Sequence, residues 1–527
     1  MDRARPALAH AVLRETSSLD SPTPDDGLDA PSGRPARELA TSLGDHDGTS
    51  TYSRAFVNSL FAIYLLIGLG LIALTPPFQS ADAFAHFDRE VGIARGQLIA
   101  STHHGSSGSD LPIGVLWLED EFSTLPFNSF SRVSASQFRI GNEFDWNTPP
   151  TFVKYTTGGN IPFLYLPQVL GVEIGRLLSP RILVSYYLAE VMNLLAFLGL
   201  ARWAFSRLPR RLAIPLGVFL LLPLMTSIAI SVNPDCLLMA LSTVLATACY
   251  RAYTAYREDV AASGVSPRDE EARAASRAAM SRWYYVGFAS LFFMTLDKPP
   301  LILLGLLLPL VDLYSNLRRY VIRVLTFIAS AGIVYELWSR FGARGAGGPI
   351  PASTFAPARQ LRLMVTDPLK DTEVLATTLW RSGWIFWEQL VAGIGWLDVF
   401  FPRWVYTSLT VLVVASIFSI VPRSTLGTWR LVWSLAVLIL TALGTSFSLY
   451  VFYSSYGATT INGLQGRYYL PLIPMLIVVL GIQTTHSPLS RRFANVVGEY
   501  GGTALISFQI LVATEYAVTL LQRYWYH

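Results

Sequence analysis

Ionisable side chains of both signs lie close together in the segment PPFQSADAFAHFDRE, residues 76–90. A carboxylate or a neutral imidazole can take a proton from an attacking hydroxyl, and a cation can hold an anionic leaving group. A segment that carries all three kinds of group is a candidate for acid–base and transfer chemistry. We expect Asp82 and His86 to be its catalytic members, with Arg89 in support.

Three more turns place ionisable or amide side chains next to apolar runs. They read NPD at 233–235, LDKPP at 296–300 and LQGRYYLP at 464–471. An ionisable group at bilayer depth costs roughly 2.5–3.5 kcal/mol, so it needs a partner or a function. We expect these groups to form one site with the first segment, with Lys298 and Arg467 as its functional cations and the rest in support: Asn233, Asp235, Asp297, Gln465 and Tyr468.

Each of these residues also has a purely structural explanation. Asp235 is well placed to cap the helix that follows it. Lys298 can extend to the lipid headgroups or pair with its neighbour Asp297, and Arg467 can anchor a helix at the interface. The sequence leaves these alternatives open.

Aromatic residues mark a second region of interest. Trp380, Trp384 and Trp387 are spaced four and three apart, so they share one face of a helix. They form either an aromatic belt in the headgroup layer or a platform on which sugar rings or a lipid stack. Trp396 and Asp398 follow shortly after, and we include them among the supporting residues.

Evidence for a metal site is weak. His103, His104 and Asp110 lie near one another, but their spacing matches no standard site and a polar loop is the simpler explanation. Cys236 and Cys249 are thirteen positions apart in one apolar run, which predicts neither a disulfide nor a Cys metal site. No cofactor is certain, although a divalent metal is possible.

The composition indicates a polytopic membrane protein. The 527 residues are 52% hydrophobic and only 14% charged, and the net charge of +4 does not argue for nucleic acid. Residues 56–74 form an uncharged run long enough to cross a hydrocarbon core of about 30 Å, and no cleavage site for a signal peptide follows it. Residues 1–52 lack apolar periodicity and are expected to be a disordered cytoplasmic tail.

Arginine clusters predict the topology, because Lys and Arg are enriched in cytoplasmic loops. Placing the clusters inside puts the N-terminus in the cytoplasm and the C-terminus outside. The fold class is then an all-α integral membrane protein with about eleven spans. These are 56–74, 182–201, 212–230, 236–253, 283–296, 299–313, 321–338, 404–421, 431–452, 468–482 and 502–521.

Two long outer loops follow from this topology, 75–181 and 339–403. The apolar segment 161–178 carries Glu173 and Arg176 and is expected to be interfacial or re-entrant. Residues 254–281 should form a solvated cytoplasmic helix. The main domain is then 53–482, and 483–527 forms a C-terminal helix region.

The chain resembles a family of bacterial polytopic membrane proteins of unknown function that is grouped with the GT-C class of glycosyltransferases. The resemblance rests on six ordered pieces between about residues 75 and 480: PPFQSADAFAHFDR, IPFLYLPQVLG, LPLMTSIAISVNPD, DKPP, GWLDVFFPRWVY and QGRYYLPLIP. The family usually has Pro-Asp-Glu-Pro where this chain has residues 81–84, ADAF. The second acid is missing, which weakens a two-carboxylate metal site.

The resemblance implies a GT-C-like fold, a plasma membrane location in bacteria and a polyprenyl-phosphate sugar as donor. It also implies a catalytic acid in the first outer loop, which Asp82 matches best. With such a donor, Lys298 and Arg467 are expected to bind the donor phosphate. The expected partners are the donor, a glycan or glycolipid acceptor and membrane lipid. The alternatives are a transporter or flippase of lipid-linked saccharides, and a glycan polymerase or ligase.

Overall fold

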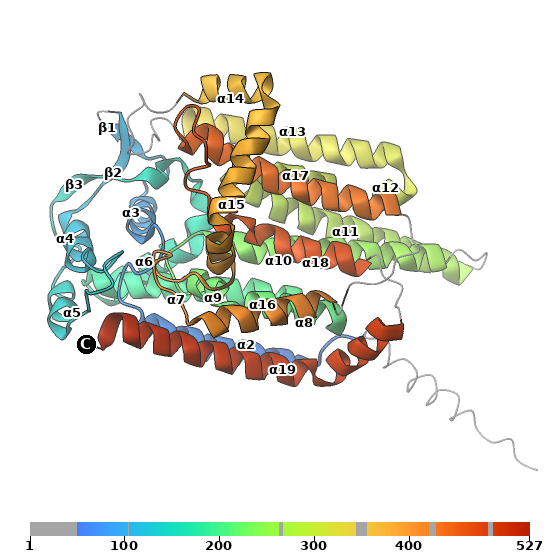
Figure 1. Ribbon diagram of the computed structural model, residues 1–527, viewed down its shortest axis with the longest axis horizontal. Helices are drawn as coiled ribbons and strands as arrows, with labels where there is room; N and C mark the ends of the chain where they lie inside the picture. Colours follow the sequence, from blue (N-terminus) through green and yellow to red (C-terminus); the bar gives the residue numbers. More distant parts are fainter. Residues whose placement is uncertain are drawn as a thin grey trace, which may run out of the picture. The chain divides into compact units, whose positions relative to one another are not determined.

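The computed structural model describes residues 50–103, 105–262, 267–343, 356–418, 420, 428–482 and 488–526. The predicted tail, 1–52, lies outside the described residues except for its last three positions. The described chain is predominantly helical, and Figure 1 shows its long helices running side by side.

Several helices are long and apolar enough to span a membrane. In the described residues there are six of them, or seven if the pair α8 (Arg210–Leu220) and α9 (Pro223–Ala229), bent by 71°, is one span. The chain is therefore an all-α membrane protein, but the predicted count of eleven spans is not confirmed. The six are α2 (Arg54–Leu74), α7 (Ile182–Phe205), α10 (Asp235–Ala261), α13 (Leu317–Phe341), α17 (Thr428–Tyr453) and α19 (Pro488–Leu520), the last continuing into η5 (Leu521–Trp525).

Proline and length explain why the other predicted spans are less regular. Pro223 starts a new helix inside the predicted span 212–230, and a proline lacks the N–H that a continuous helix needs. Prolines likewise limit the segments at 299–313 and 468–482 to short helical pieces. The remaining elements are α11 (Pro267–Asp297), η3 (Pro299–Leu306), α12 (Leu310–Ser315), α16 (Arg403–Phe418), η4 (Gly466–Leu472) and α18 (Ile473–Ile482).

Residues 75–181 fold into a small substructure at one end of the helices (Figure 1). A three-stranded antiparallel sheet, in the order β1-β2-β3, pairs Ser101 with Gly108 and Gly108 with Lys154. The sequence did not predict this sheet, because β1 and β2 are short and mostly polar and β3, PTFVK, has only five residues. Its elements are α3 (Ala83–Ala94), β1 (Ser101–His103), β2 (Ser106–Pro112), α4 (Ile113–Phe122), α5 (Ala135–Gly141), β3 (Pro150–Lys154), η1 (Thr156–Gly159) and η2 (Pro162–Tyr165).

The apolar segment 161–178, expected to be interfacial or re-entrant, contains α6 (Leu166–Leu178), which has 13 residues. At 1.5 Å per residue it is about 20 Å long, too short to cross the bilayer alone. Gly171 and Gly175 let it approach α7 closely, since a Cβ at either position would lie 2.4 Å from the nearest α7 atom. Glu173 and Arg176 form an ion pair with each other at 2.7 Å.

The second long loop contains α14 (Pro357–Thr366) and α15 (Pro368–Ala392), and α15 crosses the long helices in Figure 1. Its tryptophans do not all face the same way. Trp380 and Trp384 are 91% and 64% exposed, whereas the Trp387 Nε1 donates to Thr410 Oγ1 on α16 at 2.9 Å. Exposed tryptophans beside membrane spans are typical of an aromatic belt.

The core is packed around α10. In its most apolar stretch, 89% of the residues are buried, and α7, α11 and α18 pack against it. Because this stretch is covered on all sides, the first residue of α10, Asp235, is held in a buried position. Asp235 is part of the candidate site.

Candidate active site

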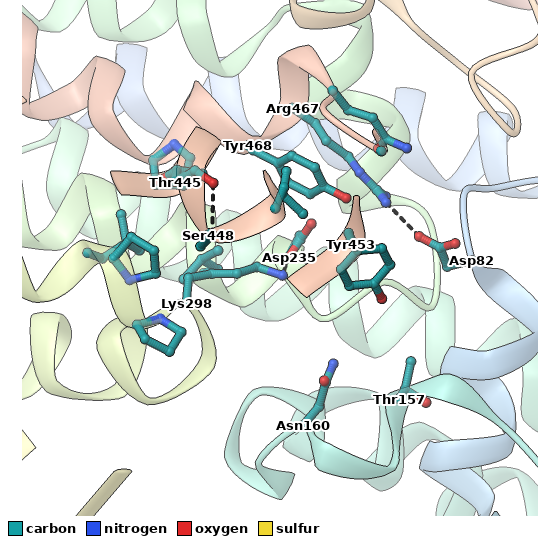
Figure 2. Close-up of a pocket in the computed structure, with 18 of the residues that line it drawn as sticks. Asp82, Thr157, Asn160, Asp235, Lys298, Thr445, Ser448, Tyr453, Arg467 and Tyr468 are labelled. Carbon is teal, nitrogen blue, oxygen red and sulfur yellow. Dashed lines mark hydrogen bonds and ion pairs between the residues drawn. The ribbon is translucent and has the colours of Figure 1, made fainter. Parts of the chain in front are cut away.

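A cavity of about 350 Å³ lies where α10 begins and α11 ends, which we call the site end of the helices. Figure 2 shows side chains from segments far apart in the sequence converging on it. Seven residues predicted from the sequence line it: Asp82, His86, Asp235, Lys298, Gln465, Arg467 and Tyr468.

Asp82 stands on an unusual backbone. Its φ of 62° is left-handed, a conformation that Asp tolerates better than most residues. It precedes α3 but makes no side-chain capping bond; instead, Oδ2 accepts from the Arg467 guanidinium at 2.5 Å. Burial acts to raise the pKa of Asp82, but the charge of Arg467 and the proximity of His86 outweigh it, so the pKa lies below its ordinary value. The carboxylate is ionised at neutral pH.

Arg467 is held by the loop that precedes it. The Gly466 N–H donates to Gln389 Oε1 of α15 at 3.2 Å, and a Cβ at Gly466 would lie 2.1 Å from the Phe386 carbonyl oxygen. Only glycine permits so close an approach. The Arg467 side chain is 6% exposed and lies 5.4 Å from the ring centre of Tyr468, so it has little freedom to move.

Lys298 lies between two carboxylates. Its Nζ is 3.3 Å from Asp235 Oδ1 and 3.5 Å from Asp297 Oδ2. The double proline that starts η3 fixes the turn. Pro234 is the N-cap residue of α10, and Asn233 Oδ1 accepts from the Asp235 N–H at 2.9 Å. The side chain of Asp235 is therefore engaged with Lys298, not with capping.

His86 is buried and uncharged at neutral pH. Its Nδ1 is 2.8 Å from the Tyr165 hydroxyl, which also accepts from Asn160 Nδ2 at 3.1 Å. Burial lowers the pKa of His86 to about 4 in spite of the nearby Asp82. Since Nδ1 is engaged by Tyr165, Asp82 is the better placed of the two predicted proton acceptors.

Neutral polar residues complete the cavity, and sequence inspection missed them. Thr157 and Asn160 lie opposite the ion pairs, and Ser448 and Tyr453 come from the end of α17 (Figure 2). The Thr157 hydroxyl donates to the Ala85 carbonyl at 2.6 Å, which ties η1 to α3. Nothing in the local sequence distinguishes these side chains from ordinary loop or span residues.

A comparison with models of known protein families identifies the family of the chain. The family model described as "Predicted membrane protein (DUF2142)" matches residues 65–476. The chain belongs to this family. The matched range contains every residue that lines the cavity. No curated protein and no solved structure matches the chain.

Five predicted supporting residues of this DUF2142 protein are not among those that line the cavity: Asn233 and Asp297, described above, and Arg89, Trp396 and Asp398. Arg89 is fully buried and donates to the carbonyls of Gln97, Leu98 and Asn160. Trp396 Nε1 donates to the Phe78 carbonyl at 2.8 Å. Asp398 accepts from the backbone N–H of Trp396 and of Phe127. These residues hold the loops that carry Asp82 and Asn160 and so support the site from a distance.

Asp88 and Glu90, the other two acids of residues 76–90, are buried away from the cavity. Asp88 forms a carboxyl pair with Glu119 of α4. Burial raises the pKa of Asp88 to about 8 and that of Glu119 well above its ordinary value. Glu90 is fully buried as well. The ionisable side chains of residues 76–90 therefore fall into two groups. Asp82 and His86 line the cavity, and Asp88, Arg89 and Glu90 lie in the interior.

Carboxylates at the site are already engaged by cations. Asp82 pairs with Arg467 and Asp235 with Lys298, and in the described residues no group of three or more His, Cys, Asp or Glu side chains is placed to hold a metal ion. His103 stacks on Phe152 at 4.2 Å, and His104 lies outside the described residues. Cys236 and Cys249 are buried free thiols.

Proposed function

We propose that the protein is a membrane glycosyltransferase that moves a sugar from a polyprenyl phosphate to an extracytoplasmic glycan or glycolipid acceptor. The proposal rests on one observation: the cavity at the site end joins an ionised carboxylate, two cations and an apolar wall at the end of membrane-spanning helices. A lipid-linked sugar phosphate needs this combination.

The donor phosphate is assigned to Lys298 and Arg467. Arginine binds phosphate with two parallel N–H groups and lysine acts as a point charge. Apolar side chains line the same cavity and suit the first isoprenoid units of the lipid: Leu238, Met239, Leu301 and Leu449. Lys298 is 36% exposed, so its ammonium group is accessible to a ligand.

The transfer step uses Asp82 as the proton acceptor. The acceptor hydroxyl oxygen forms a bond to the anomeric carbon while the bond from that carbon to the phosphate oxygen breaks. The hydroxyl proton passes to Asp82, and the electron pair of the broken bond leaves with the polyprenyl phosphate. Lys298 and Arg467 stabilise the charge that develops on this leaving group.

The ion pairs suggest how the donor activates the site. Before the donor binds, Arg467 holds Asp82 and lowers its pKa, which makes the carboxylate a weak base. A bound phosphate competes for the guanidinium, so the carboxylate regains basicity when the donor is present. Neutral groups of the cavity, among them Asn160, Gln465 and Tyr453, are left to hydrogen-bond the sugar hydroxyls.

The finer parts of the proposal rest on the resemblance to the GT-C class. They are the GT-C-like fold, inversion at the anomeric carbon and the bacterial plasma membrane. The orientation with the site end outside rests instead on the distribution of arginines among the loops. In this orientation the cavity faces a donor whose sugar lies just beyond the bilayer.

The test is a transfer assay with the purified full-length protein in vesicles. A panel of polyprenyl-phosphate sugars, each labelled in the sugar, is offered with a glycan or glycolipid fraction as acceptor. Time-dependent release of polyprenyl phosphate together with label in the acceptor supports the proposal. Movement of intact donor across the bilayer without cleavage would instead identify a flippase.

A further inference from the structure

A second cavity lies at the opposite end of α10, α11 and α13 from the site end. Its volume is about 390 Å³, in the range of small-molecule sites. Asp259 comes from the last part of α10, Arg277 from the first part of α11, Asp312 from α12, and Arg319 and Arg323 from the first turns of α13. Because α10 and α11 separate the two cavities, this one is not part of the site already described.

Each acid of this cavity shares its charge with two arginines. Arg323 Nη1 lies 2.6 Å from Asp312 Oδ2, and Arg319 Nη1 lies 3.9 Å from Asp312 Oδ1. Asp259 has Arg277 and Arg273 at 3.3 Å and 3.7 Å. Three arginines and two acids line the cavity, so its charged side chains carry a formal charge of +1 before any ligand binds.

The arginines are placed to bind an anion. Arg323 lies over the ring of Tyr284 at 4.3 Å and is fixed by Asp312. Arg277 and Arg319 have side chains that are 57% and 56% exposed, so they can turn toward a ligand. Several guanidinium groups around one cavity suit a phosphate group, which arginine binds with paired N–H donors.

The surroundings of the cavity indicate which kind of phosphate compound it suits. The helix that carries Arg319 and Arg323 has large apolar side chains on its outer surface: Leu317 at 65%, Val321 at 44%, Ile322 at 53% and Leu325 at 60% exposure. α13 is long and apolar enough to span a membrane, and only 17% of its most apolar stretch is buried, so we expect these side chains to face lipid chains. A basic pocket next to a lipid-facing helix surface is the arrangement that binds anionic headgroups.

We propose that this cavity binds the phosphate headgroup of an anionic phospholipid, with the acyl chains lying along α13. The chemistry is that of a phosphate ester, which a soluble phosphate compound would share. The continuous apolar surface beside the arginines favours the lipid. This site shares no lining residue with the proposed transferase site, so a test of one does not decide the other.

The test compares three probes on the purified full-length protein in neutral detergent. Thermal unfolding is followed during titration with dioctanoyl phosphatidylglycerol, dioctanoyl phosphatidylcholine and inorganic phosphate. We expect saturable stabilisation by phosphatidylglycerol and none by the other two at the same concentrations. The variant is Arg277→Gln with Arg319→Gln, which leaves Asp259 with Arg273 and Asp312 with Arg323, so neither acid loses all its partners.

The double variant should bind phosphatidylglycerol about thirty-fold more weakly, since each basic residue near a membrane surface contributes about five-fold. Arg318→Gln is the matched control, because Arg318 is exposed on the same helix and does not line the cavity. Equal affinity in the double variant and the control would overturn the site. Stabilisation by phosphatidylcholine to the same extent, or by inorganic phosphate alone, would overturn its assignment to an anionic lipid.

Discussion

Replacing Asp82 by Asn tests the centre of the proposed mechanism. The change keeps the volume and leaves Oδ1 as an acceptor for Arg467, but it removes the group that takes the proton. Loss of a general base typically lowers the rate by about 10²–10⁴, which corresponds to roughly 3–5 kcal/mol in the activation barrier. We expect a fall of this size in kcat.

Stability should change much less. The Asp82 side chain is 50% exposed, and in the variant the buried Arg467 keeps an amide oxygen as acceptor and the negative charge of Asp235 nearby, so we expect a loss of about 1 kcal/mol. The effect on transfer and the effect on folding should therefore differ by several kcal/mol, which separates a catalytic role from a structural one.

The assay measures initial rates of label transfer and of polyprenyl phosphate release, with thermal unfolding measured on the same preparations. Asp110→Asn is the matched control, because Asp110 lies in the same loop on β2, is exposed and does not line the cavity. Transfer by the Asp82 variant within a few-fold of wild type would refute the assignment of the base. Loss of transfer only in proportion to loss of folded protein would refute it as well.

Three further predictions follow from the structure. Lys298→Gln and Arg467→Gln should each weaken donor binding, and the double variant should fall short of additivity because both cations hold one phosphate; unchanged donor affinity in all three would rule out the phosphate clamp. Asp88 keeps its proton when folded up to about pH 8 but loses it above its ordinary value of 3.8 when unfolded, so stability falls as pH rises between these values. Asp88→Asn should reduce the drop in melting temperature between pH 5 and pH 8, and an identical drop would show that the pair does not titrate. In a cysteine-free background, a cysteine at Asn462 should react with an impermeant reagent from outside and one at Arg277 should not; the reverse pattern would invert the topology.

Sequence reasoning located the ion-pair residues of the site because their environment is exceptional. Lys298 and Arg467 are charged groups beside apolar runs, and such groups need partners. The pattern also predicted an all-α membrane protein, and the family resemblance was confirmed for its membrane-protein part.

The partners themselves could not be predicted. Arg467 meets Asp82 from a position 385 residues away, and Lys298 meets Asp235 across two helices. Tertiary packing brings these residues together, and the sequence around each residue does not indicate its partner. Asn160 was missed for the same reason, since its environment depends on Arg89 holding its carbonyl. The span count depended on hydrophobic length, which does not register the breaks that proline introduces at Pro223 and Pro309.

The pairing of Asp82 with Arg467 sets an order of events during biosynthesis. At about 5–20 residues per second, the ribosome reaches Arg467 roughly 20–80 s after it has made Asp82. Asp82, which is made first, is half exposed in the folded protein and can remain hydrated until Arg467 is made. Arg467 becomes almost fully buried, and its counter-ion has already been synthesised when it leaves the ribosome. The nascent chain thus never has to bury the cation alone, and a protein that terminates before this arginine has an open, incomplete site.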